Sequence, residues 1–372
     1  ENLIYLLLTQ NKYKKTKMKI INKSDSYVIA NKISTVNIEN SFKNSFNLMQ
    51  KAGKLAAKNI DLLYTKRKTL ILCGIGGNGG DGFIIAQELS NKGWDIKVSI
   101  VGDQNKIKGD SLKALKILKL KLFNFDKINL DKSKLFIDAI YGIGLSRNIN
   151  NKECAILNTI DKHPAPVIAI DIPSGIDCNT GKILGFAAYC DLTITFSTLK
   201  IGHILIPGSE KINKIKILDI GISKDVINKI KPDIKINSKN QWLNKIIWPK
   251  IDDHKYSRGY SLIIGGPRNM TGASRLAALS AQRAGSGIVA LVSDKKAEEI
   301  YFNSLTSQLV KTYKNIKEYN SIINEYRVDS IVIGPGLDIS NSSILKIKSV
   351  LKTNKRIVLD AGAISCFKNK LE

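Results

Sequence analysis

The feature that most constrains the fold is a short apolar run, residues 69–73, that leads directly into a glycine-rich segment at 74–82. A continuous apolar run of this length is typical of a strand buried in a parallel sheet. Successive backbone N–H groups without Cβ atoms can surround a phosphate, and the start of the following helix adds partial positive charge. The segment lacks the Lys-Ser/Thr of an NTP-hydrolysing loop. We therefore expect a nucleotide-handling α/β domain that does not hydrolyse NTP.

Apolar runs and amphipathic segments alternate along the rest of the chain. We expect helices at 41–64, 83–90 and 111–120, and strands at 69–73, 97–101, 135–140, 166–170, 191–196 and 216–220. A second pattern follows a loosely patterned connection, with strands at 260–264, 288–292, 330–333 and 357–359 and a helix at 273–284. Such alternation predicts parallel sheets covered on both faces. The second sheet has only about four expected strands, fewer than is usual.

The length of 372 residues exceeds one average domain. We expect two three-layer αβα Rossmann-like domains with mainly parallel sheets, at 18–225 and 226–372, the second of them incomplete. Residues 1–17 precede Met18 and are expected to be upstream sequence rather than part of the fold. The apolar run at 3–8 is too short for a membrane span and lacks the flanks of a secretory signal, so we expect no membrane association.

The formal net charge of +26 raises the possibility of nucleic-acid binding. The lysines are spread over the whole chain, however, and no zinc-finger spacing or aromatic RNA-binding motif accompanies them. We therefore expect no specific nucleic-acid partner, although the charge can attract phosphorylated ligands. None of the five cysteines forms a CxxC pair, which suits a reducing cytoplasm.

Polar residues follow three of the expected strands. Asn78 lies in the glycine-rich segment, Asp138 closes another apolar run, and Asp171 and Ser174 follow the next. One Asp beside glycine is often only a cap or turn, but the carboxyl ends of parallel strands share one edge, where ligands bind. The oxygens of Asn78, Asp138 and Ser174 suit a hard cation such as K⁺. Asp171 is then free for substrate contact or proton transfer.

The motifs at 76–82, 138–144 and 171–175, in this order, resemble the NAD(P)H-hydrate epimerase family; the segments 48–53, 200–208 and 219–221 also fit. That family interconverts the R and S epimers of hydrated NADH and NADPH, which are damaged cofactors. The resemblance implies a K⁺ site at Asn78, Asp138 and Ser174, and a catalytic, substrate-contacting Asp171. It implies further hydrate contacts at Gly77, Asn78, Gly79, Gly80, Asp81, Gly142, Ile143, Gly144, Leu145, Ser146, Arg147 and Asn148. Where the family usually has Asn-Asn, this chain has Gly77-Asn78, so one polar contact is missing.

The second half resembles the NAD(P)H-hydrate dehydratase family, a ribokinase-like fold often fused behind the epimerase in bacteria. The matching stretches are 254–259, 264–266, 270–273, 283–287, 334–336 and 360–363. The resemblance implies dehydration of the S hydrate with ADP and Mg²⁺, and hydrate contacts at Ala273 and Gly336. The family's Pro-His-Gly-Glu segment and its nucleotide loop ending in Gly-Asp do not occur in this sequence. We therefore expect this half to be inactive as it stands, and a full-length protein to catalyse both steps of metabolite repair.

Two other functions are compatible with the same fold. The first is a non-catalytic nucleotide-binding scaffold, but such relatives usually lose the site acids that Asp138 and Asp171 represent here. The second is a sugar or vitamin kinase, which would need the same nucleotide loop that the dehydratase family carries. We expect the NAD(P)H hydrate as the small-molecule partner, and a homo-oligomer whose size no sequence feature specifies.

Overall fold

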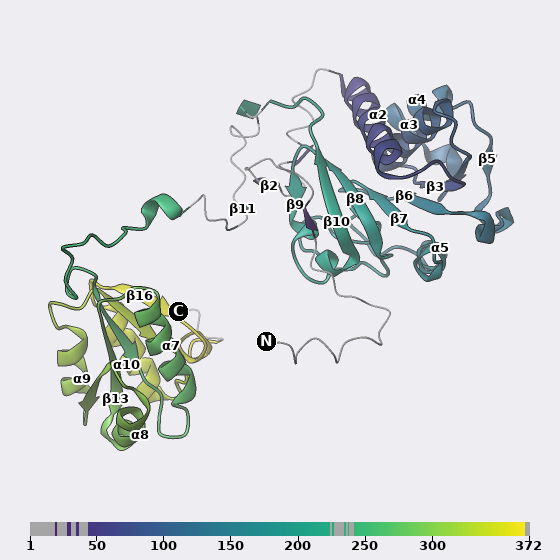
Figure 1. The fold of residues 1–372 in the computed structure, drawn as a ribbon. Helices are drawn as coiled ribbons and strands as arrows, with labels where there is room; N and C mark the ends of the chain where they lie inside the picture. The colour runs from purple at the N-terminus through teal and green to yellow at the C-terminus, as the bar shows by residue number, and fades with distance from the viewer. Residues whose placement is uncertain are drawn as a thin grey trace, which may run out of the picture. The chain divides into compact units, whose positions relative to one another are not determined.

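The computed structural model describes residues 44–223 and 242–368, with short pieces at 19–20, 28–30, 35–36, 225–226, 234–235 and 237 (Figure 1). The chain divides into two compact units, Glu1–Ser238 and Lys239–Glu372. The boundary that the sequence suggested, after residue 225, lies somewhat earlier than this division. The segment expected to be upstream sequence, 1–17, lies outside the described residues.

The first unit is built on an eight-stranded sheet in the order β1-β10-β8-β7-β6-β3-β4-β5, in which all neighbouring strands are parallel. The strands are β1 (Lys19–Ile20), β3 (Thr69–Cys73), β4 (Ile96–Ile100), β5 (Leu122–Phe123), β6 (Leu135–Ala139), β7 (Val167–Ile170), β8 (Cys190–Phe196) and β10 (Ile212–Leu218). A parallel sheet is confirmed. The last strand begins four residues before the predicted 216, because Asn213, Lys214 and Lys216 interrupt its apolar positions, which therefore form no continuous run.

Helices cover both faces of this sheet, as a parallel sheet requires. On one face lie α2 (Ser45–Leu63), α3 (Gly77–Asn91) and α4 (Gly109–Ile117), and on the other lies α5 (Asn151–Lys162) (Figure 1). Alternate residues of the buried strand β3 enter the two cores: Ile71 packs with α2 and α3, and Leu72 packs with α5. The small side chains of α2 allow a close approach to α3, since a Cβ at Gly53 would lie only 2.6 Å from Ile84.

The prediction that the second helix begins at residue 83 is wrong, because this helix, α3, begins at Gly77. Glycine lowers helix propensity by about 1 kcal/mol per residue, and a glycine-rich segment therefore suggests a loop. Tertiary packing overrides that preference here. The glycine-rich segment consists of a short turn at 74–76 followed by the first turns of the helix.

The order in which the chain adds strands to the sheet reverses at β3. From β3 the chain builds β4 and β5 toward one edge, and it then returns to the other side of β3 to build β6, β7 and β8. In open α/β sheets, ligands bind in the crevice beyond the carboxyl ends of the strands at such a switch point. A small sheet of β11 (Ile234–Lys235), β2 (Val28–Ala30) and β9 (Leu199–Lys200) accompanies the large one.

The second unit has a parallel sheet in the order β14-β13-β12-β15-β16. Its strands are β12 (Tyr260–Ile264), β13 (Ile288–Asp294), β14 (Leu309–Tyr313), β15 (Ser330–Ile333) and β16 (Arg356–Leu359), and its helices are α7 (Gly272–Arg283), α8 (Glu298–Ser304), α9 (Ile316–Ile323), α10 (Asn341–Leu351) and α11 (Gly362–Ser365). The expected four strands are one too few. The sequence missed β14 because this edge strand is mostly half-buried and carries Lys311 and Thr312. None of the described helices is long and apolar enough to cross a membrane.

Candidate functional site

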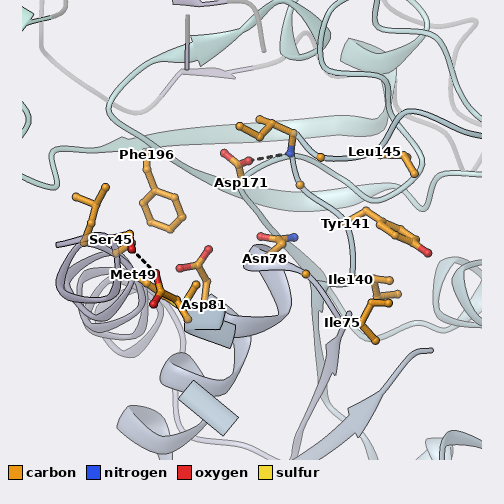
Figure 2. A pocket seen from close by; sticks show the side chains of 18 of the residues that line it. Ser45, Met49, Ile75, Asn78, Asp81, Ile140, Tyr141, Leu145, Asp171 and Phe196 are labelled. Atoms are coloured by element: carbon orange, nitrogen blue, oxygen red, sulfur yellow. Dashed lines mark hydrogen bonds between the residues drawn. The ribbon is translucent and has the colours of Figure 1, made fainter. Parts of the chain in front are cut away.

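A cavity of about 480 Å³ lies in the first unit, at the switch point between β3 and β6. The start of α3, the loop after β6, the residue after β7 and the N-terminal half of α2 supply its lining (Figure 2). Its ionisable side chains are Asp81, Asp110, Tyr141 and Asp171, and none of the described residues that line it is basic. A phosphate bound here would therefore depend on backbone N–H groups and the helix start.

The glycines at the start of α3 are there for two different reasons. A Cβ at Gly74 would lie 2.0 Å from the carbonyl oxygen of Ile140, and one at Gly79 would lie 1.8 Å from the carbonyl oxygen of Gly74. Only glycine fits at these two positions, which bring the helix start against the ends of the strands. A Cβ at Gly77 would meet no heavy atom within 4 Å. Gly77 therefore leaves open space beside the cavity instead of serving close packing.

The side-chain amide of Asn78, which lines the cavity, makes no hydrogen bond. The residue is 8% exposed, and neither its Oδ1 nor its Nδ2 has a hydrogen-bond partner. Buried amide groups in proteins are almost always hydrogen-bonded, and leaving one unpaired costs on the order of 1–3 kcal/mol. An unpaired polar side chain on the wall of a cavity is available to bind a ligand.

Asp138, on β6, is fully buried and is held entirely by neutral groups. The hydroxyl of Ser174 donates to its Oδ1 at 2.6 Å and the Ser174 N–H donates to its Oδ2 at 2.8 Å. The N–H of Ile140 also donates to Oδ1, at 3.2 Å. Burial raises the pKa of Asp138, and these hydrogen bonds offset only part of the effect. The carboxylate therefore lacks a compensating positive charge among these partners.

Asp171, directly after β7, is held in the opposite way. The Nζ of Lys200 donates to its Oδ1 at 2.7 Å and the hydroxyl of Thr195 donates to the same oxygen at 3.2 Å. Its Oδ2 accepts from the N–H of Ile143 at 3.3 Å and faces the cavity (Figure 2). Burial alone would raise the pKa of Asp171, but the charge and hydrogen bond of Lys200 outweigh it and hold that pKa below its usual value. The carboxylate is ionised at neutral pH.

The backbone of Asp171 is held as firmly as its side chain. Its φ of 66° lies in the left-handed region that non-glycine residues rarely adopt. Its N–H donates to Ile194, and the Nε2 of His203 lies 2.8 Å from its carbonyl oxygen. Because the Nδ1 of His203 accepts from the N–H of Lys200 at 3.0 Å, Nε2 is the protonated nitrogen. Burial lowers the pKa of His203 to about 4, so the ring is neutral.

The side chains of Asn78 and Asp171 both lie next to Gly142. A Cβ at Gly142 would lie 2.9 Å from the Oδ2 of Asp171 and 3.4 Å from the Cβ and Cγ of Asn78. The two side chains project from α3 and from the end of β7 toward one space (Figure 2). The structure therefore brings together an unpaired amide and an anchored carboxylate.

The residues that the sequence assigned to the hydrate fall into two groups. Those that line the cavity are Gly77, Asn78, Asp81, Gly142, Ile143, Gly144, Leu145 and Asp171, and those outside its lining are Gly79, Gly80, Ser146, Arg147 and Asn148. Arg147 is exposed, and its guanidinium donates to the hydroxyl of Tyr141 at 3.1 Å. Asp138 and Ser174 are buried beside the cavity without lining it.

Sequence reasoning gave no role to Thr195, Lys200 or His203. Lys200 and His203 appear there only as part of the matching segment 200–208. One local signal was available, because Thr193 and Thr195 are polar and are both buried in β8. The partnership of Lys200 with Asp171 joins residues 29 positions apart in the chain, which one sequence does not reveal.

The second unit has its own cavity of about 490 Å³ beyond the carboxyl ends of β12, β13 and β15. Its lining includes the basic residues Arg268, Lys296 and Lys346 and the acids Asp294 and Asp338. The two positions that the sequence assigned to the hydrate, Ala273 and Gly336, do not line it. Gly336 instead packs against the backbone, since a Cβ there would lie 2.3 Å from the carbonyl oxygen of Met270. No group of three or more His, Cys, Asp or Glu in the described part of the chain is arranged to hold a metal ion.

The fold defines a protein of two Rossmann-like α/β units, each with a cavity beyond the carboxyl ends of a parallel sheet. Residues 45–202 match the family model described as YjeF-related protein N-terminus. Residues 261–372 match the model described as NAD(P)H-hydrate dehydratase. In both units the chain is therefore similar to the bifunctional NAD(P)H-hydrate repair enzymes.

Curated relatives match across both units. The bifunctional NAD(P)H-hydrate repair enzyme of Dictyoglomus turgidum is 32% identical over 82% of this chain and 62% of its own length. That of Moorella thermoacetica is 28% identical over 86% of this chain and 64% of its own length. The chain thus spans a little under two thirds of these relatives. The crystal structure of the yeast protein ynu0 covers 57% of this chain and 98% of its own, with 20% identity and a TM-score of 0.46.

Proposed function

We propose that the first unit interconverts the R and S epimers of hydrated NADH and NADPH. The observation that carries the proposal is the meeting of Asn78 and Asp171 at Gly142, in the cavity at the switch point of the sheet. The relatives named as NAD(P)H-hydrate repair enzymes supply the substrate class. The cavity volume of about 480 Å³ suits one end of a dinucleotide.

The chemistry of the hydrate determines what the site has to stabilise. Its reacting carbon, C6, bears a hydroxyl group and is bonded to the ring nitrogen. The hydrogen on C6 is not adjacent to a carbonyl group, so its loss as a proton would leave an unstabilised carbanion. If the hydroxyl instead leaves with a solvent proton as water, the nitrogen lone pair forms a C=N bond and the ring becomes cationic. Return of water to the opposite face, with release of a proton to solvent, yields the other epimer.

Asp171 is suited to that cation. Its ionised carboxylate presents Oδ2 to the cavity, and a fixed negative charge stabilises a positive charge that develops in a site with little water. The same oxygen can accept a hydrogen bond from the water that leaves or returns. A neutral amide at this position would supply neither the charge nor the strong acceptor.

Asn78, Asp138 and Ser174 fit a monovalent cation. Asn78 has an unpaired amide oxygen, and Asp138 is a buried carboxylate held only by neutral donors. Buried charges in proteins are normally paired. When bound, K⁺ supplies the positive charge that these oxygens lack and orders the segments that carry them. Asp138 and Ser174 would hold it from the β6 and β7 ends, and Asn78 from the start of α3.

The test uses the purified chain and one pure epimer of NADPH hydrate in K⁺ buffer, with the two epimers separated by chromatography. We expect conversion faster than the spontaneous rate, and a loss of at least about a hundredfold in Asp171→Asn. Asp95→Asn is the matched control, because Asp95 is an exposed acid at the opposite end of the sheet. Conversion no faster than without protein would refute the proposal and favour the scaffold alternative.

For the whole protein we propose a second step, ADP-dependent dehydration of the S hydrate to NAD(P)H. The basic side chains Arg268, Lys296 and Lys346 around the second cavity support binding of an anionic nucleotide. The described residues offer no three-ligand acidic cluster, so we assign no Mg²⁺ site and derive no step through the metal. Calorimetric titration of ADP into the chain tests the nucleotide site directly.

The cellular setting is also part of the proposal. The five cysteines are free thiols in the structure, which supports a reducing compartment such as the cytoplasm. We further propose a homo-oligomer, on the expectation formed from the sequence. Sedimentation of the purified chain at micromolar concentration measures its state, and a single monomeric species would contradict the oligomer.

A further inference from the structure

One short segment holds Asp171 at both its side chain and its backbone. Thr195 at the end of β8, Lys200 on β9 and His203 in the turn that follows all contact this one residue. We call these three residues the 195–203 clamp. Contact with both parts of one residue fixes its position as well as its charge.

The ammonium group of Lys200 has no hydrogen-bond donor left for a substrate. It is 1% exposed, and its Nζ donates to the Oδ1 of Asp171 at 2.7 Å, to the Thr195 hydroxyl at 2.8 Å and to the Phe196 carbonyl at 3.2 Å. An ammonium group has three donors and no acceptor, so all of its hydrogen bonds are used. A buried ammonium needs a charged partner, and Asp171 is that partner. Lys200 can therefore act on a substrate only through Asp171.

The clamp leaves only one oxygen of Asp171 for the cavity. Its Oδ1 is engaged by two donors of the clamp, whereas its Oδ2 receives a single long bond from the N–H of Ile143. His203 supports the strained backbone of Asp171 through the carbonyl oxygen. Strained residues that the surrounding structure holds in this way cluster at functional sites.

We propose that Lys200 is a positioning residue which, with Thr195, keeps the Asp171 carboxylate ionised and turns Oδ2 toward the substrate cavity. The inference rests on the proposed epimerase function and deepens it. An anchored anion suits the cationic intermediate that loss of the C6 hydroxyl creates. It also predicts that Asp171 loses its function when it is protonated, and that the charge of Lys200 prevents this at neutral pH.

The other ionisable groups around Asp171 leave a clear range for a pH test. Hydrogen bonding by Lys113 lowers the pKa of Asp110 below its usual value. Burial raises the pKa of Tyr141 to about 12, and burial lowers that of His203 to about 4. None of these three groups changes charge between pH 6 and 9. Asp81, from α3, is the remaining acid on the cavity wall.

The experiment compares Lys200→Met with the wild type from pH 6 to pH 9. Without Lys200, the effect of burial on Asp171 is opposed only by smaller contributions such as the Thr195 hydrogen bond, so we expect its pKa to rise, by up to several units for a buried carboxyl. We expect kcat of the variant to be about 10- to 100-fold lower at pH 7 and to recover toward the wild-type value at pH 9. Lys68→Met is the matched control, since Lys68 is exposed and precedes β3 at the opposite end of the sheet. Asp171→Asn should show no recovery at any pH.

A second variant and a second readout cover poor folding of Lys200→Met. Thr195→Val removes one donor from the Oδ1 of Asp171 but keeps the lysine, so we expect a smaller loss, under about tenfold, that high pH also reverses. The carboxyl ¹³C resonance of Asp171, assigned by its absence in Asp171→Asn, reports ionisation without any substrate. It should not titrate between pH 5 and 9 in the wild type, and it should titrate within this range in Lys200→Met.

The possible outcomes distinguish a failure of the inference about Lys200 from a failure of the proposed function. A loss in Lys200→Met that is equal at every pH, or a wild-type resonance that titrates near neutral pH, would overturn the role of Lys200 even if the wild type is active. An inactive wild type whose Asp171 stays ionised would refute the proposed function, and with it the role of Lys200 in the reaction. Recovery of the active variant at high pH, with the matching ¹³C titration, would support both.

Discussion

Gly142→Ala tests whether the position of Asp171 matters as much as its presence. The added methyl would lie 2.9 Å from the Oδ2 of Asp171 and 3.4 Å from the nearest side-chain carbons of Asn78. Gly142 is not one of the residues with a positive φ, so alanine can adopt its backbone conformation. The carboxylate cannot retreat freely, because Lys200 and Thr195 hold its other oxygen. The strain therefore falls on the two side chains proposed to serve the reaction.

The size of the effect follows from the distance. Relief from 2.9 Å to an ordinary contact of 3.4 Å requires a movement of 3.4 − 2.9 = 0.5 Å. A misplacement of about 1 Å can cost about a hundredfold in rate, so half of it corresponds to about tenfold. That equals about 1.4 kcal/mol of lost transition-state stabilisation. Overpacking should also lower the free energy of unfolding by about 1–3 kcal/mol.

The assay measures kcat and KM of epimerisation together with urea unfolding, so that lost activity is separated from lost stability. Gly272→Ala is the control, because a Cβ there would also meet no heavy atom within 4 Å and the residue lies in the second unit. It should behave as the wild type. Full activity in Gly142→Ala, or an equal loss in both variants, would refute the argument that Asp171 must stay where the clamp places it.

Three further predictions concern other parts of the site. Gly77→Asn fills open space with the residue that resemblance leads us to expect there; KM should fall severalfold with kcat unchanged, and a rise in KM would contradict this. Replacing Na⁺ by K⁺ should stabilise the wild type by ~1.4 kcal/mol at ten times Kd, and Asn78→Ala should abolish this difference in thermal unfolding. The folded-state pKa of His203, about 4, lies below its unfolded value, so its contribution is present above about pH 6.5 and lost as the pH falls toward 4. Urea unfolding at pH 7 and pH 5 should differ by about 2 kcal/mol more in the wild type than in His203→Gln.

The sequence predicted those parts of the fold that depend on local pattern. Continuous apolar runs such as 69–73 identified the central strands, and the polar residues that follow them identified the edge of the sheet where Asn78 and Asp171 meet. The edge strand β14 escaped because a strand that is only half-buried has no continuous apolar run. Local pattern is informative where a strand has a continuous apolar run and weak where polar residues interrupt it.

The start of α3 shows a second limit of sequence reasoning. Glycine is a poor helix former, so the glycines at 76–82 suggested a loop, yet most of them lie in the helix. The reason is contact with residues distant in sequence: a Cβ at Gly80 would lie 2.7 Å from the Sδ of Met49, and a Cβ at Gly82 would lie 2.8 Å from the Cβ of Ala139. The same limit hid Lys200, whose partner lies 29 residues away.

Two carboxylates of the first unit, Asp138 and Asp171, argue for a division of roles. They lie at the ends of neighbouring strands, but burial among neutral donors raises the pKa of Asp138, whereas Lys200 overcomes burial and lowers that of Asp171. Titratable groups whose environments push their pKa values apart commonly have different functions in one site. Asp138 has no positively charged partner among its hydrogen-bond donors and does not line the cavity, so its proposed role is to bind a cation. Asp171 is already paired with the ammonium group of Lys200 and presents its Oδ2 to the cavity, so its charge is available to the substrate.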